Sequence, residues 1–161
     1  MARVRVELRK QSLELLDDDG RMLREYTVST SKNGAGEQCD SDCTPRGKHI
    51  IRAKIGAGLP PYAVFVGRRP TGEVYSSELG ARHPGRDWIL SRILWLSGCE
   101  PGYNRLGRVD TMRRFVYIHG TSDEQRLGVA VSRGCIRMRN RDIIELFDQV
   151  GPGTAVEIVE T

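Results

Sequence analysis

The feature that most constrains the fold is the alternation of apolar and polar residues in short runs near the N-terminus. Residues 3–8, 12–16 and 22–30 alternate with a period of two, which is typical of half-buried β-strands. Residues 17–20, Asp-Asp-Asp-Gly, separate the second run from the third. An Asp-Gly turn between alternating runs predicts a β-hairpin. We therefore expect a mainly β chain with minor α structure.

The later segments extend this pattern. Short apolar runs at residues 49–54, 63–67, 87–96 and 154–159 predict further strands. The segments between them are rich in glycine and proline, and the chain holds 18 glycines and 7 prolines, which favours a sheet with long loops over a helical bundle.

Four other segments have specific expectations. Asn140 stands where a helix cap is expected, and the apolar face after it predicts the one short helix of the chain. Residues 68–87 are expected to be irregular. Residues 98–109 form a loop long enough to cover a pocket as a flap, and the polar loop at 31–47 is expected beside the functional site.

Composition limits the organisation and the partners. With 161 residues and 39% hydrophobic content, residues 1–161 are expected to form a single domain. The net charge of +4 is spread along the chain, so no nucleic-acid-binding tract is indicated. A mild positive field dominated by arginine is compatible with an anionic substrate that carries carboxylates.

The N-terminus lacks the apolar core of a signal peptide, and no later segment is long enough to span a membrane. We expect a cytoplasmic protein, or a periplasmic one if an export segment has been removed. The four cysteines fit free thiols in a reducing compartment, whereas Cys39 and Cys43 are candidates for a disulfide in an exported protein.

The candidate chemistry lies between Tyr117 and Met138. One apolar run ends in His119, and a second short run ends in Cys135. Both are predicted as strands with a polar residue at the end, so that the two side chains meet across a hairpin. Because a thiol nucleophile needs a nearby base, Cys135 is the candidate nucleophile and His119 its general base and acid.

The neighbouring residues suggest how such a site would work. Gly134 permits close approach of a substrate and is expected to leave its own N–H and that of Cys135 free for an oxyanion. His119, Arg133 and Arg137 are expected to favour the thiolate by lowering the pKa of Cys135. The carbonyl of Gly120 is a candidate to hold one imidazole nitrogen.

Structural roles compete with this interpretation. A cysteine is commonly a small buried apolar residue, and a histidine at a strand end is commonly a hydrogen-bonded structural residue. His49 and His83 are expected to be non-catalytic. Cys39, Cys43 and His49, with Cys99 or His83 as a fourth ligand, have loose spacing for zinc, and we expect no metal or other cofactor.

The motifs resemble the signature of the L,D-transpeptidase catalytic (YkuD) family. The strings are IHGT at 118–121 and SRGCIRM at 132–138, followed by Asn140. Supporting matches cover almost the whole chain: QSLEL at 11–15, VSTS at 28–31, TP-x-G at 44–47, SRIL at 91–94 and GYN at 102–104.

The resemblance implies a β-rich, YkuD-like sandwich with one short helix after the cysteine, and an acyl-enzyme mechanism on the stem peptides of peptidoglycan. By motif position Cys135 is the nucleophile, His119 the base and then the acid, and Gly120 supplies the orienting carbonyl. Ser132 shapes the pocket, and Arg137 faces a substrate carboxylate.

The family usually attacks the bond that joins the L-centre of diaminopimelate to a terminal D-alanine. Arg133 departs from the family pattern, which usually has histidine there; this leaves His119 as the one histidine of the motif.

The resemblance leaves several activities open. We favour an L,D-carboxypeptidase that trims tetrapeptides in cytosolic peptidoglycan recycling. One alternative is a periplasmic L,D-transpeptidase that forms cross-links or exchanges D-amino acids. A second alternative is a non-catalytic domain that binds muropeptides. Carbapenem-type β-lactams are candidate acylating ligands of the thiol.

Overall fold

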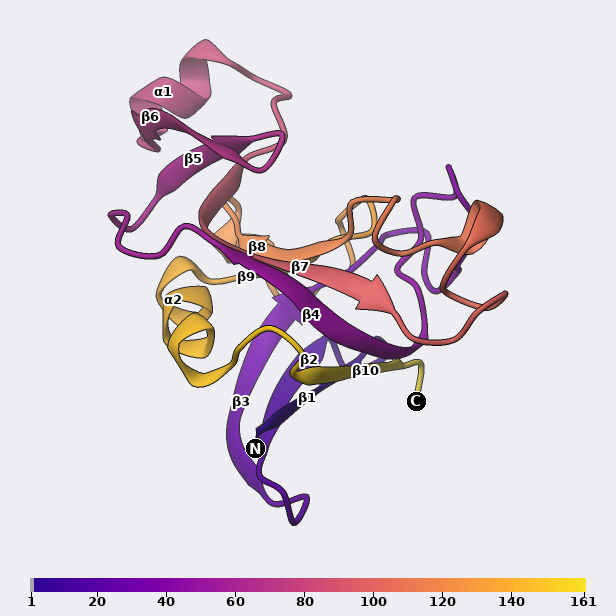
Figure 1. Cartoon of the computed structure of the whole chain (residues 1–161). Coiled ribbons are helices and arrows are strands. Elements are labelled where there is room, and N and C mark those ends of the chain that lie inside the picture. The colour runs from indigo at the N-terminus through magenta and orange to yellow at the C-terminus, as the bar shows by residue number, and fades with distance from the viewer. Residues whose placement is uncertain (1) are drawn as a thin grey trace.

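The protein is a mainly β structure in the computed structural model, which describes residues 2–161 (Figure 1). The strands are β1 (Arg3–Glu7), β2 (Ser12–Leu16), β3 (Met22–Ser29), β4 (Gly47–Ile55), β5 (Ala63–Val66), β6 (Arg69–Val74), β7 (Ile89–Gly98), β8 (Tyr117–Gly120), β9 (Ile136–Met138) and β10 (Ala155–Val159). The helices are α1 (Ser77–Arg82) and α2 (Asn140–Gln149), with short 3-10 turns η1 (Gly107–Val109) and η2 (Glu124–Arg126).

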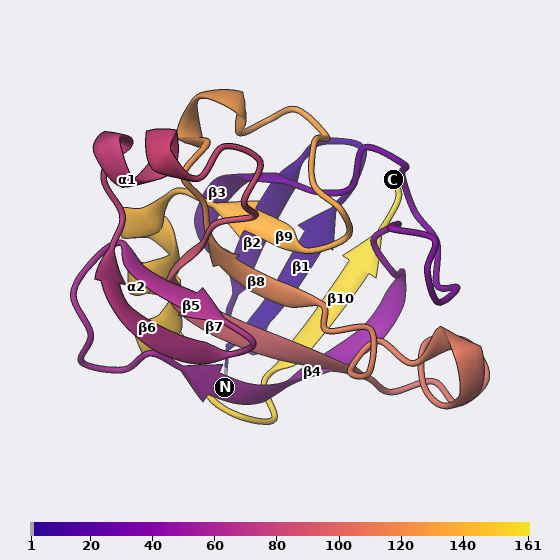
Figure 2. The same ribbon diagram turned by 90° about the horizontal axis from the view of Figure 1, so that it is seen from above.

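Eight of these strands close into a ring. The order is β4-β10-β1-β2-β3-β9-β8-β7, and β7 pairs back onto β4, while the β5–β6 hairpin extends from β7. Seen from above, β1, β2 and β10 lie behind β7 and β8, so the ring is flattened into a sandwich-like shape (Figure 2). The sequence prediction of a mainly β, sandwich-like fold is confirmed.

The alternating residues fill the inside of this ring. Val4, Leu13, Val28, Ile118 and Ile136 are each no more than 1% exposed and belong to one apolar cluster. Because side chains alternate between the two faces of a strand, the residues between them face outward. Helix α2 adds Ile143, Leu146 and Phe147 to the same cluster, as its amphipathic pattern predicts.

The predicted N-terminal hairpin is confirmed. Strands β2 and β3 pair antiparallel, and the Gly20 N–H donates to the Asp17 carbonyl at 3.1 Å across the turn. Gly20 has φ +83°, a left-handed conformation that glycine adopts without steric cost. The local sequence therefore determines this part of the ring.

Two expectations about segments are wrong. Residues 68–87 are not irregular, because they contain β6 and α1. Strand β6 pairs with β5, and Ser76 caps α1 by accepting the Leu79 N–H at 3.1 Å. The alternation in β6 is obscured because five of its six residues are exposed and need not be apolar. Figure 1 shows this hairpin and α1 projecting from one end of the ring.

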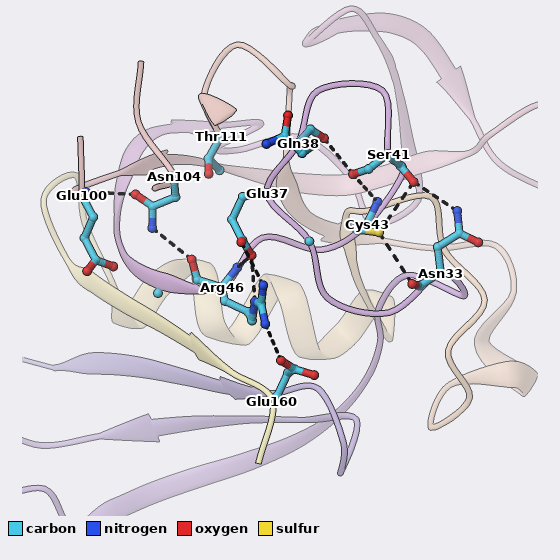
Figure 3. A network of polar contacts seen from close by, with 12 residues as sticks. Asn33, Glu37, Gln38, Ser41, Cys43, Arg46, Glu100, Asn104, Thr111 and Glu160 are labelled. Carbon is cyan, nitrogen blue, oxygen red and sulfur yellow. Dashed lines mark hydrogen bonds and ion pairs between the residues drawn. The ribbon is translucent and has the colours of Figure 1, made fainter. Parts of the chain in front are cut away.

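The loop at 98–109 is not a flap over the site. Asn104 is fully buried and donates to the carbonyls of Arg46 and Lys48 at 3.0 and 3.1 Å, which ties this loop to the start of β4. Nearby, Arg46 forms a two-pronged ion pair with Glu37 and a 2.6 Å contact with Glu160 (Figure 3). These contacts anchor the polar loop that leads into β4.

His49 is a structural residue in β4, as its sequence context suggests. It is 1% exposed, with Nδ1 3.1 Å from the Gly47 carbonyl and Nε2 3.0 Å from Thr111 Oγ1. Burial lowers its pKa to about 4 because the buried site disfavours the charged imidazolium.

This lowered pKa predicts acid sensitivity. As the pH falls from 6.5 to 4, the unfolded chain takes up a proton at residue 49 that the folded chain does not, so the free energy of unfolding falls by about 3 kcal/mol through this histidine. Chemical denaturation at pH 7 and pH 4 should show a smaller loss for His49→Gln than for the wild type. Equal losses in both proteins would contradict this assignment.

Candidate active site

The parallel pairing of β8 with β9 brings the candidate residues together. Ile118 pairs with Ile136 and His119 with Arg137. Since Ile118 and Ile136 point into the core, His119 and Arg137 lie on the opposite face of the two strands, together with Tyr117 and Cys135, which flank the same positions. Cys135 and His119 therefore lie on one face of the sheet and line the same cavity.

The expected hairpin between these segments is wrong. Strands β8 and β9 run parallel, and Cys135 lies just before β9 rather than at the end of a strand. Parallel strands need a crossover connection, and residues 121–135, which include η2, supply it. Both polar residues still line one cavity, because the parallel register places His119 opposite Arg137 and leaves Cys135 on the same face, next to Tyr117.

The β5–β6 hairpin walls the site. Phe65 of β5, Ile93 of β7 and Tyr117 form a second apolar cluster, against which the half-buried Cys135 packs. An open cavity of about 460 Å³ lies beside them, and its lining includes His119, Cys135, Arg137 and Asp87. His119 is 1% exposed, so it contributes to this cavity from a nearly water-free position.

One imidazole nitrogen of His119 is occupied. Nδ1 lies 2.6 Å from the carbonyl oxygen of Gly120, which accepts a hydrogen bond and so requires the proton on Nδ1. The other nitrogen, Nε2, then carries a lone pair and is suited to act as a base. Burial lowers the pKa of His119, an effect that the Gly120 carbonyl opposes only in part, so the neutral imidazole is the resting form.

Asn140 holds the backbone around Gly120. Its Nδ2 donates to the Thr121 carbonyl at 2.7 Å and to Glu124 Oε2 at 3.0 Å, and its Oδ1 accepts from Ser91 Oγ at 2.6 Å. A Cβ at Gly120 would lie 2.4 Å from Asn140 Oδ1, so only glycine fits there.

Asn140 was expected as a helix cap, and this is wrong. It is the first residue of α2, after a capping position at Arg139 that makes no side-chain cap bond. Its amide is committed to the strand end that carries His119.

Cys135 is held as a neutral thiol. The Tyr117 N–H donates to its Sγ at 3.3 Å, and the sulfur lies 3.5 Å from the Phe115 carbonyl. Burial raises the pKa of the Cys135 thiol to about 11, and the Tyr117 N–H, Arg137 and Arg114 lower it only in part. The expectation of a lowered pKa is therefore wrong, because desolvation outweighs the nearby guanidinium groups.

Ser132 shapes the turn that presents the thiol. Its hydroxyl donates to the Cys135 carbonyl at 2.6 Å and accepts the Gly134 N–H at 3.2 Å. Thr44 Oγ1 donates to the Gly134 carbonyl at 3.0 Å, and Gly134 has φ +124°, which favours glycine. The expectation that the Gly134 N–H is free for an oxyanion is wrong, since Ser132 already accepts from it.

The two motif arginines differ in their environment. Arg137 is 14% exposed at its side chain, and its Nη2 lies 3.4 Å from Asp87 Oδ1. Arg133 is exposed, and it lines the cavity beside His119 as well as a second cavity on the other side of Cys135. Both guanidinium groups are therefore placed where a ligand of Cys135 would meet them.

The second cavity has a volume of about 280 Å³ and connects the thiol with the loop at 31–47. Cys39, Asp40 and Asp42 of that loop line it together with Cys135. Arg114 fixes the loop, since its Nη2 donates to the Cys43 carbonyl at 2.7 Å. The prediction that this loop lies beside the site is confirmed.

The sequence did not point to a stacked group at the cavity wall. The Arg68 guanidinium lies 4.4 Å from the ring centre of Phe115 and 5.0 Å from that of Trp95, and it donates to the Tyr117 hydroxyl at 2.9 Å. The alternation of Tyr117 with Ile118 could have indicated that the Tyr117 side chain faces away from the core. It could not indicate that Arg68 and Trp95, which come from distant segments, lie beside it.

The cysteines and possible ligands form no metal site. Among residues 2–161 no group of three or more histidine, cysteine, aspartate and glutamate side chains is arranged to hold a metal ion, and all four cysteines are free. In the same part of the chain, no helix is long and apolar enough to cross a membrane.

Comparisons with known proteins identify the family of the chain. The family model of the L,D-transpeptidase catalytic domain (YkuD) matches residues 1–158. YkuD of Bacillus subtilis is 38% identical over 104 residues, which cover 62% of this chain and 53% of YkuD. YqjB of the same species is 32% identical over 135 residues, which cover 84% of this chain and 58% of YqjB. Both carry the name L,D-transpeptidase, and the chain spans little more than half of each.

Solved structures share the fold at low sequence identity. An L,D-transpeptidase from Mycobacterium smegmatis has a TM-score of 0.56 at 18% identity, covering 98% of this chain and 58% of that one. L,D-transpeptidase 3 from Mycobacterium tuberculosis, in complex with a faropenem-derived adduct, has a TM-score of 0.60 at 15% identity, with 99% and 60% covered.

The raised pKa of Cys135 makes a testable prediction for the free protein. Below pH 11 the thiolate fraction of a lone thiol grows about tenfold per pH unit, so alkylation of Cys135 by iodoacetamide should keep rising from pH 7 to pH 10. Peptide mass spectrometry measures this rate at each cysteine separately. A plateau near neutral pH would show a stable thiolate and contradict the neutral thiol.

Asn140→Ala should destabilise the protein and disturb the site together. The change leaves Ser91 Oγ, the Thr121 carbonyl and Glu124 without their buried partner, and we expect a loss of about 2–4 kcal/mol in the free energy of unfolding. Denaturant titration measures it. Asn33→Ala, in an exposed loop, is the matched control and should change stability little. Equal effects of the two changes would refute the role of Asn140.

Proposed function

Because this chain belongs to the L,D-transpeptidase catalytic domain (YkuD) family, we propose that it is a cysteine acyl-enzyme peptidase of peptidoglycan stem tetrapeptides. The bond cleaved joins the L-centre of the third residue, usually diaminopimelate, to the terminal D-alanine. The observation that carries the proposal is that Cys135 and His119 line one cavity from one face of the β8–β9 pair, with Arg137 beside them.

The first half of the reaction starts from a neutral pair. The Cys135 sulfur attacks the carbonyl carbon while His119 Nε2 takes the thiol proton, so no isolated buried thiolate has to form beforehand. The resulting imidazolium is stabilised by the Gly120 carbonyl at Nδ1. It then gives the proton to the departing D-alanine amine, which leaves an acyl thioester on Cys135.

The surroundings of the thiol supply the binding groups. The Cys135 N–H is the proposed donor to the oxyanion, because the Gly134 N–H is held by Ser132. Arg137 is the proposed partner of the D-alanine carboxylate, since its guanidinium lines the cavity and its contact with Asp87 is long. Ser132 acts as a positioning residue through the turn that it holds.

Water is the proposed acceptor in the second half, which makes the protein an L,D-carboxypeptidase. The half-buried thiol faces an open cavity, and the loop at 98–109 is tied to β4 instead of lying over it. His119 Nε2 removes a proton from the water that attacks the thioester, and it returns this proton to the sulfur as the C–S bond breaks. This releases the shortened peptide as a carboxylic acid and regenerates the Cys135 thiol. We place this activity in the trimming of soluble tetrapeptides during cytosolic peptidoglycan recycling, which is part of the proposal.

A second candidate is transfer to an amine, which gives cross-links or D-amino acid exchange. The observation in its favour is the cavity of about 280 Å³ on the other side of Cys135. Asp40 and Asp42 line it with exposed carboxylates, which attract an ammonium group.

Acylation of Cys135 by carbapenem-type β-lactams also follows from the proposal. Such a ring presents a strained carbonyl to the same thiol, and the related M. tuberculosis protein is seen with a faropenem-derived adduct. A mass increase on Cys135 of one inhibitor molecule would accompany loss of peptidase activity.

Mass spectrometry of a muropeptide tetrapeptide tests the proposal. The wild type should release D-alanine, and Cys135→Ala should release none, because the acyl-enzyme needs the sulfur. A parallel reaction with an added D-amino acid distinguishes water from an amine as the acceptor: little exchange product supports the carboxypeptidase, and a dominant exchange product supports the transferase. If neither product depends on Cys135, the chain is a muropeptide-binding domain and the proposal fails.

A further inference from the structure

A third, smaller space next to the catalytic cavity is a cleft lined by four guanidinium groups. Its volume is about 180 Å³, and the arginines come from different segments: Arg86 before β7, Arg126 in η2, Arg133 in the turn before Cys135, and Arg137 in β9. We call it the arginine cleft. Arg133 and Arg137 belong to the family-like motif and also line the catalytic cavity. Arg86 and Arg126 lie outside the motif and line the arginine cleft without lining the catalytic cavity.

The positive charge of this cleft is not fully compensated. Asp87 and Asp123 are the two carboxylates that line it. Asp87 lies 3.4 Å from Arg137, and Asp123 forms an ion pair with Arg126. Glu73, outside the lining, pairs with Arg86 at 3.2 Å. In the part of the chain that the structure describes, three of the four arginines of the cleft are therefore paired with a carboxylate, and one is not.

Arg133 is that arginine. It is exposed and makes no ion pair or hydrogen bond with residues 2–161. Because the neighbouring guanidinium groups repel it and no carboxylate of residues 2–161 forms an ion pair with it, an anionic ligand in the cleft is favoured electrostatically. The planar fork of a guanidinium matches the two oxygens of a carboxylate, so carboxylate is the ligand chemistry that fits.

The arginine cleft is continuous with the catalytic cavity. Asp87, Arg133 and Arg137 line both spaces. The hydroxyl residues Thr121 and Ser122, directly after β8, add polar groups to the floor of the cleft. A substrate whose reacting carbonyl lies at Cys135 can therefore place a nearby side chain in the cleft while its leaving residue occupies the larger cavity.

We propose that the arginine cleft is a carboxylate subsite that selects a substrate whose third residue ends its side chain in a free carboxylate. This rests on the proposed function, which sets the third residue at the acyl position. Its side chain branches from the carbon next to the attacked carbonyl, whereas the D-alanine carboxylate lies on the leaving side, next to Arg137. Arg133 and Arg126 then bind the side-chain carboxylate and determine the specificity.

Two tetrapeptides test the subsite: one with a free carboxylate at the end of the third side chain, and one with that group as a carboxamide. For D-alanine release by the wild type, kcat/KM should be at least tenfold higher with the carboxylate tetrapeptide than with the carboxamide tetrapeptide. Arg133→Gln and Arg126→Gln should each reduce this preference to about threefold or less, mainly by slowing the carboxylate substrate.

The control is Arg21→Gln, an exposed arginine in the turn between β2 and β3, which Figure 1 shows at the other end of the molecule from α1. It should keep the wild-type preference. General damage to a variant lowers kcat/KM for the carboxamide substrate as well as for the carboxylate substrate. Loss of the subsite lowers kcat/KM for the carboxylate substrate alone. A wild type without preference, or a preference unchanged in both cleft variants, would overturn the subsite.

A binding measurement separates this inference from the proposed function. Calorimetric titration of Cys135→Ala with the two tetrapeptides should show at least tenfold tighter binding of the carboxylate form, and Arg133→Gln in the same background should remove the difference. If the wild type releases no D-alanine but this difference persists, the peptidase proposal fails and the subsite stands. If release occurs without any difference in binding or turnover, the subsite fails alone.

Discussion

The parallel ladder between β8 and β9 is the interaction on which the rest of the site depends. It pairs His119 with Arg137 and thereby sets Cys135 beside Tyr117, whose N–H reaches the sulfur. The same ladder buries Ile118 and Ile136 in the core of the ring. A shift of one residue would turn every side chain to the opposite face, so the apolar core fixes the chemistry on the other side.

Desolvation sets the chemical state of the pair. The walls that position Cys135 and His119 also remove water, which raises the pKa of the thiol and lowers that of the imidazole. Both groups rest in their uncharged forms, and in the proposed reaction a proton moves from the thiol to the imidazole as the sulfur attacks the substrate. In the proposed reaction the guanidinium groups act on the anionic substrate, while desolvation keeps the cysteine protonated although arginines surround the site.

The sequence predicts those parts of the fold that depend on local pattern. The strands of the N-terminal hairpin follow from alternation and from the Asp-Gly turn, and residue type and spacing make Cys135 and His119 the candidate catalytic pair. The parallel direction of β8 and β9 could not be found this way, because strand direction depends on the crossover between them and not on the strands.

Other features need tertiary contacts that a sequence does not display. Asn140 has the residue type of a cap, yet its amide is taken by Ser91, Thr121 and Glu124. The Gly134 N–H donates to the hydroxyl of Ser132, two residues earlier, because the turn brings the two groups together. The pKa of the Cys135 thiol depends on burial beside the β5–β6 hairpin, and the exposed residues of β6 hide this hairpin in the sequence pattern. The arginine cleft combines residues from four separate segments.

The proposed chemistry depends on a neutral His119, and nitrogen-15 NMR of the free protein at pH 7 reports the protonation state of this ring. Long-range proton–nitrogen correlations distinguish the two ring nitrogens. The structure predicts a neutral ring with the proton on Nδ1, toward the Gly120 carbonyl, and an unprotonated Nε2. An imidazolium with protons on both nitrogens at pH 7 would indicate a thiolate–imidazolium pair and contradict the account.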